Sequence, residues 1–119
     1  MMPWWLAEGM AEYVASDYWT FTERRLRLAQ ARQWQQAGGL VTWEAISRFE
    51  DTPERLWPYV YIQGYAFARY VTETYGAGLR NEWLRAMADA SLEEATPAVL
   101  GMPFEELDAG FLGWLAAQD

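Results

Sequence analysis

Two glutamates, Glu8 and Glu12, are spaced so that they could act together on a cation. They lie in the segment WWLAEGMAEY, residues 4–13, and a separation of four places both carboxylates on one face of a helix. Carboxylates one turn apart repel each other by about 0.2–0.5 kcal/mol in a solvated helix, unless a cation lies between or beside them. Most such pairs simply form a solvated face. The spacing therefore leaves a pair of ligands and an ordinary surface pair both open.

A tyrosine and a glycine in the segment YIQGYA, residues 61–66, form the second candidate. Gly64 inside a helix costs about 1 kcal/mol relative to alanine, so its presence indicates that another element approaches closely there. Tyr61 precedes it by one turn and carries a hydroxyl that could take part in chemistry. It could equally be a packing residue whose hydroxyl reaches the edge of the core.

The chain has no histidine and no cysteine, which limits the metals that it could hold. The remaining ligands are carboxylates, backbone carbonyls and water, which suit Ca²⁺ or Mg²⁺ better than Zn²⁺. The net charge of −8 argues against nucleic acid as a partner, because binding phosphates requires a cationic surface. No apolar run approaches the roughly 18 residues of a membrane span. The N-terminus lacks a signal-peptide pattern, so no targeting segment indicates a compartment.

Helices are the elements that must position these residues. The chain has 119 residues, 52% of them hydrophobic and 17% aromatic, and we expect it to bury its core as a single domain, residues 1–119. No period-two pattern predicts a strand, and the helical patterns predict an all-α fold, a compact bundle of about five to six helices. We expect helices over residues 4–15, 20–36, 58–75, 79–90, 91–101 and from 103 onward, with short helical turns between 40 and 57.

Capping patterns mark two of these helices. Thr20 with Glu23, and Ser91 with Glu94, follow the S/T-x-x-E pattern in which side chain and backbone cap each other. Pro97 is expected to kink or divide the helix that Ser91 opens. The helix over residues 58–75 is apolar on nearly every face, so it should be central and buried.

Together these segments resemble the gluzincin zinc metallopeptidases, in particular the peptidase MA-like domains. WLAEGMAEY, residues 5–13, looks like the family segment that follows the H-E-x-x-H helix and supplies the third zinc ligand. The resemblance implies that Glu8 stands at this third-ligand position, and that Glu12 stands where a carboxylate supports a ligating imidazole. Tyr61-x-x-Gly64 is similar to the segment whose tyrosine donates to the oxyanion of the tetrahedral intermediate. Residues 92–101 and 104–115 resemble the closing helices, so the likeness spans the C-terminal helical lobe.

The chain departs from the family in lacking the H-E-x-x-H helix, which carries two zinc histidines and the general-base glutamate. A single carboxylate cannot hold Zn²⁺ with useful affinity, and no base remains to activate a water. We therefore expect no cofactor in this chain alone, although the parent family uses Zn²⁺. Three hypotheses remain: the C-terminal lobe of a larger peptidase, a non-catalytic interaction or oligomerisation module descended from one, and a plain helical bundle with a binding groove whose resemblance is accidental.

The first helix is also expected to associate with a partner. Five apolar residues on it are too many to face the small remaining core: Trp4, Trp5, Leu6, Met10 and Tyr13. Burying one such side chain contributes about 1.5–3 kcal/mol, so we expect either a homodimer through this helix or docking onto a missing N-terminal catalytic half. In a dimer, Glu8 and Glu12 could meet their symmetry mates, and Ca²⁺ or Mg²⁺ there would relieve the repulsion.

Overall fold

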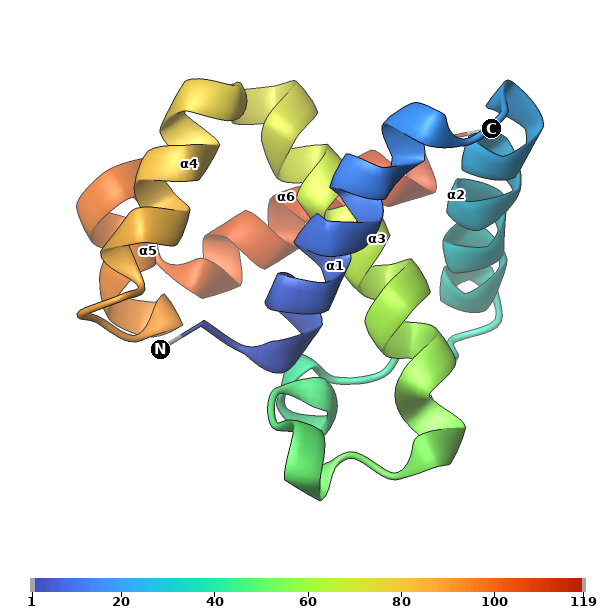
Figure 1. The fold of residues 1–119 in the computed structure, drawn as a ribbon, viewed down its shortest axis with the longest axis horizontal. Helices are drawn as coiled ribbons and strands as arrows, with labels where there is room; N and C mark the ends of the chain where they lie inside the picture. Colours follow the sequence, from blue (N-terminus) through green and yellow to red (C-terminus); the bar gives the residue numbers. More distant parts are fainter. Residues whose placement is uncertain (1, 119) are drawn as a thin grey trace.

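The computed structural model describes residues 2–118, which form six α-helices joined by short 3₁₀ turns and contain no strand (Figure 1). The helices are α1 (Trp4–Ala15), α2 (Phe21–Gln36), α3 (Trp57–Tyr75), α4 (Ala77–Ala86), α5 (Leu92–Leu100) and α6 (Phe104–Ala116). The 3₁₀ turns are η1 (Ser16–Tyr18), η2 (Trp43–Ile46), η3 (Phe49–Asp51) and η4 (Glu54–Leu56). The all-α prediction and the expected number of helices are confirmed.

Helix α3 is the centre of the molecule, as its all-round apolar sequence predicted. It runs between α1 in front and α6 behind, with α4 and α5 on one side and α2 on the other (Figure 1). Nine of its residues are buried. Among them, Phe67 packs against Trp5 of α1 and Phe111 of α6, with ring centroids 5.2 and 4.9 Å away. Because α3 contacts both layers, it fixes how the helices on either side are placed.

Both predicted caps are present. The Thr20 hydroxyl accepts a hydrogen bond from the backbone N–H of Glu23 at 3.0 Å, and the Thr20 N–H donates to the Glu23 carboxylate at 3.1 Å. Ser91 and Glu94 make the same reciprocal pair at 3.1 and 3.0 Å. These bonds lower the pKa of the Glu94 carboxyl, since the backbone N–H and the hydroxyl of Ser91 favour its charged form. Each cap satisfies backbone donors that a helix N-terminus would otherwise leave free.

One boundary prediction was wrong, and one of the two alternatives expected for Pro97 is excluded. The helix expected over residues 79–90 is Ala77–Ala86, because Gly76 turns the chain at φ +90° and a new helix can begin directly after it. The helix then ends early, where the amides of Met87 and Ala88 bond three residues back. Pro97 does not divide α5, which continues to Leu100. Only one intrahelical bond is lost there, on a face that is exposed to water.

The first helix presents less apolar surface than its sequence led us to expect. Trp5 and Leu6 are fully buried, and Trp4, Met10 and Tyr13 are partly buried. Two of the five residues therefore pack fully into the core, and the other three are covered only in part. Most of the large apolar residues that are exposed lie further along the chain, and they include Val14 (58% exposed), Tyr18 (90%) and Phe21 (72%).

No helix in the described part of the chain is both long and apolar enough to cross a membrane.

A buried hydrogen bond joins α4 to α5. The Trp83 indole N–H donates to the Thr96 hydroxyl at 3.1 Å, and that hydroxyl donates to the Leu92 carbonyl at 2.6 Å. Trp83 and Thr96 are both fully buried, so neither group can turn to water instead.

We expect Thr96→Val to lower the free energy of unfolding by about 1–3 kcal/mol, because the buried Trp83 N–H would lose its acceptor. Urea denaturation checks this value. Thr74→Val is the control, since Thr74 lies exposed on α3. Equal losses in the two variants would show that the buried bond contributes nothing of its own.

Candidate functional site

The site begins where α1 crosses α3 through two glycines. A Cβ atom added to Gly9 would lie 2.4 Å from the carbonyl carbon of Gly64, and one added to Gly64 would lie 2.6 Å from the Trp5 carbonyl oxygen. Real Cβ atoms do not approach other atoms so closely, so both positions require glycine. The close approach that Gly64 predicted is confirmed, and its partner is Gly9 of the glutamate segment.

This crossing places Glu8 and Tyr61 on the same side of the two helices. Trp4 connects them, because its indole N–H donates to the Glu8 carboxylate at 3.0 Å and its ring centroid lies 6.5 Å from that of Tyr61. The Tyr61 hydroxyl makes no hydrogen bond to any residue between 2 and 118. Glu8 and Tyr61 are therefore both neighbours of Trp4.

Glu12 shares the helix face of Glu8, as the spacing predicted, but it has a different partner. Its carboxylate forms an ion pair with Arg27 of α2 at 3.4 Å, and the Arg27 guanidinium lies 4.5 Å above the centre of the Trp19 ring. Such a partly exposed pair contributes about 0–1 kcal/mol. An imidazole from another segment would have to compete with Arg27 for this carboxylate.

An aromatic cluster, which no local pattern in the sequence predicted, surrounds the contact between Trp4 and Glu8. Trp4 lies 5.0 Å from Phe49 and 6.2 Å from Trp57, measured between ring centroids. Phe49 belongs to η3 and Trp57 opens α3. The aromatic residues of the loop between 40 and 57 were the only indication in the sequence that this segment would fold back onto α1.

A broad groove of about 860 Å³ lies beside the N-terminal end of α1. Trp4 forms part of its wall together with other aromatic residues, and five acidic side chains line it: Glu44, Glu50, Glu93, Glu105 and Asp108. Burial raises the pKa of the Asp108 carboxyl, and a hydrogen bond from the Trp43 indole at 2.9 Å opposes this shift. The groove is therefore acidic and partly aromatic.

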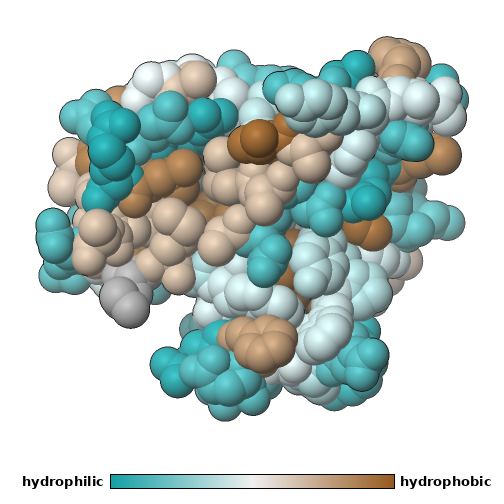
Figure 2. Space-filling model, viewed as in Figure 1, coloured by the Kyte–Doolittle hydropathy of each residue, from teal (hydrophilic) through white to brown (hydrophobic). Residues whose placement is uncertain are grey.

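The outer face of α1 includes two small side chains one turn apart. Ala7 and Ala11 are exposed at helical spacing, followed by Val14, and Figure 2 shows this face as a weakly apolar band across the front of the molecule. The side chains of Glu8 and Glu12 lie along the edge of this band, since they follow Ala7 and Ala11 by one residue each. A helix could approach this part of the surface closely at Ala7 and Ala11, where only methyl groups project.

The described residues alone do not suit a zinc ion. Glu8 offers a single carboxylate, and among residues 2–118 no three acidic side chains come together as a metal site. Any further ligands would have to come from outside residues 2–118.

The chain matches no known family model, and comparisons with the curated proteins and with the solved structures find no significant relative.

Proposed function

We propose that the chain is the C-terminal helical lobe of a gluzincin-type zinc metallopeptidase, with Glu8 at the third-ligand position and Tyr61 at the oxyanion position. The observation that supports it best is the glycine crossing of α1 and α3, which brings Glu8 and Tyr61 to one side of the molecule. A metal ligand and an oxyanion donor must lie close together, because both act on the same substrate carbonyl.

In the proposed peptidase, the outer face of α1 is the surface on which the H-E-x-x-H helix would pack. A helix bearing H-E-x-x-H would pack on Ala7 and Ala11, beside the two glutamates. The missing lobe would supply the imidazole ligands and the general base. This chain would supply Glu8, the Tyr61 hydroxyl and one wall of the substrate cleft.

The isolated chain should bind no stoichiometric zinc and cleave no peptide, because one carboxylate is too few ligands and no base is present. Metal analysis after dialysis against zinc, together with a general peptidase assay, checks this expectation. One tightly bound zinc per chain would contradict it.

The coding sequence upstream of Met1 provides the direct test of the proposed function. We expect it to encode an in-frame H-E-x-x-H helix, and the longer product to bind one zinc ion and to hydrolyse peptides in a chelator-sensitive way. Glu8→Gln in that product should release the zinc, whereas Glu82→Gln on the exposed face of α4 should not. An upstream sequence without the motif, or zinc retained after Glu8→Gln, would rule the proposal out.

A second candidate function is a non-catalytic interaction module that forms homodimers. It is favoured by the exposed apolar residues at the end of α1 and in η1, above all Val14 and Tyr18. In this case the band along α1 would pack against its own copy. Sedimentation would then give a dimer at micromolar concentration that Tyr18→Ser weakens, and a monomer would count against it.

A further inference from the structure

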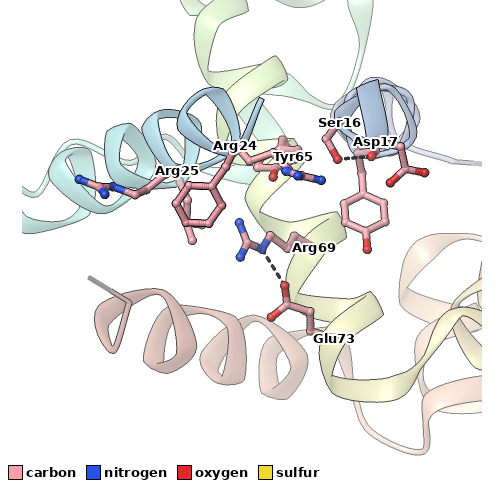
Figure 3. Close-up of a pocket in the computed structure, with 10 residues that line it drawn as sticks. Ser16, Asp17, Arg24, Arg25, Tyr65, Arg69 and Glu73 are labelled. Atoms are coloured by element: carbon pink, nitrogen blue, oxygen red, sulfur yellow. Dashed lines mark hydrogen bonds and ion pairs between the residues drawn. The ribbon is translucent and has the colours of Figure 1, made fainter. Parts of the chain in front are cut away.

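A second pocket, of about 360 Å³, opens between the end of α1, the start of α2 and the middle of α3 (Figure 3). Neither Glu8 nor Tyr61 lines it. Its apolar lining includes the buried side chains of Leu28 and Tyr65. The pocket is therefore a separate feature, and a ligand bound in it would be independent of the proposed function.

The pocket concentrates positive charge in a chain whose net charge is −8. Three of its lining residues are arginines, Arg24, Arg25 and Arg69, and two are acids, Asp17 and Glu73. The side chain of Arg25 points away from the pocket, so two arginines and two acids face it. With cations and acids in nearly equal number, a ligand of low charge suits the pocket better than a doubly charged phosphate.

Two of the arginines have hydrogen-bond donors to offer a ligand. Arg24 is half-buried and pairs with no acid among residues 2–118, and Figure 3 shows its guanidinium directed toward the middle of the pocket, near Tyr65. Arg69 donates from Nε to Glu73 at 2.7 Å, which leaves its terminal amino groups turned toward the pocket. Burial lowers the pKa of Arg69, but Glu73 and Tyr65 outweigh it and the pKa is raised, so the group stays charged. Arg25, by contrast, points away.

An exposed phenyl ring completes the pocket. Phe21 lines the pocket and is 72% exposed. A large apolar ring in this position gains from a ligand that covers it. Two guanidinium groups match the planar geometry of a carboxylate, and the apolar body attached to that carboxylate could lie against Phe21 and Leu28.

We propose that this pocket binds a singly charged carboxylate that carries an aromatic or branched aliphatic group. The carboxylate lies between Arg24 and Arg69, and the apolar group lies on Leu28 and beneath Phe21. A free organic acid and the C-terminal residue of a peptide share this chemistry.

Calorimetric titration of the intact chain with matched probes tests the charge requirement. We expect 3-phenylpropanoate to bind at least about tenfold more tightly than its uncharged amide, because only the acid engages the arginines. N-acetyl-Ala-Ala-Phe with a free or an amidated C-terminus distinguishes the sources: tighter binding of the free peptide than of 3-phenylpropanoate identifies a peptide C-terminus, and the reverse identifies a small acid. No binding by either carboxylate at millimolar concentration, or equal binding of acid and amide, would overturn the proposal.

Variants of the two neighbouring arginines locate the contact. Arg24→Gln should weaken 3-phenylpropanoate binding about tenfold, whereas the matched Arg25→Gln should change it by less than about twofold, since that side chain points away. Asp17→Asn should strengthen binding by removing a nearby negative charge. Circular dichroism confirms that each variant is folded. Equal losses of affinity in the two arginine variants would show that the ligand responds only to the overall positive charge nearby, and would overturn the proposed contact with Arg24.

Discussion

Replacing Gly9 by alanine is expected to lower the free energy of unfolding by about 3 kcal/mol, the upper end of the range for overpacked cores. The added methyl carbon would lie 2.4 Å from both the carbonyl carbon and the carbonyl oxygen of Gly64. These are backbone atoms of the central helix, so they cannot rotate away as a flexible side chain would. The two helices would have to separate, and Trp5 would lose part of its contact with the core. Thermal and urea unfolding of the purified variant measure the loss.

Gly113→Ala is the matched control for this change. Gly113 also lies inside a helix, but apart from its own helix backbone no atom of residues 2–118 is within 4 Å of the position that its Cβ would take. Alanine there should raise the stability by about 0.5–1 kcal/mol, because it reduces the freedom of the unfolded chain. The two identical substitutions should therefore have opposite effects. If Gly9→Ala unfolded at the same urea concentration as the unmodified chain, α1 and α3 could not cross as closely as described.

Replacing Tyr61 by phenylalanine should lower the turnover of the complete peptidase by about 10²–10³, with little change in substrate binding. The lost group is a single hydroxyl that has no partner among the described residues. For the same reason, Tyr61→Phe should leave the stability of the isolated chain almost unchanged. Peptide hydrolysis by the longer product and urea denaturation of this chain measure the two effects.

Tyr59→Phe provides the comparison. Tyr59 is also on α3, but its ring packs against Trp34 of α2 at 4.2 Å, away from Trp4 and Glu8. Removing the Tyr59 hydroxyl should change the turnover of the complete peptidase by less than about twofold. A near-normal rate in Tyr61→Phe would remove that residue from the active site, and a large stability loss in the isolated chain would show that it is a packing residue after all.

The helices that local signals mark were predicted correctly. Thr20 and Ser91 open α2 and α5 with side chains that bond to their own backbone, so sequence neighbours alone determine these ends. The end of α4 was missed because it depends on where the chain must turn to bring Trp83 against Thr96. That requirement comes from the packing of two helices, and no pattern within α4 shows it.

In the candidate site too, the features that depend on local spacing were predicted, and the long-range contacts were not. Helical spacing placed Glu8 and Glu12 on one face, and Gly64 indicated a close neighbour. The pairing of Glu12 with Arg27 joins residues fifteen positions apart in the chain, and the contact of Trp4 with Phe49 depends on how the loop folds. Such contacts follow from the tertiary arrangement, so no local pattern of residues indicates them.

The paired glycines fix the position of α1 along α3. Each helix has one position without a side chain, so sliding either helix by a turn would bring a residue with a Cβ against a backbone that has no room for it. The height of Glu8 above α3 is therefore set by main-chain contact. Substitutions among the surrounding aromatic residues can change the stability of the chain, but they should have little effect on the position of the Glu8 carboxylate.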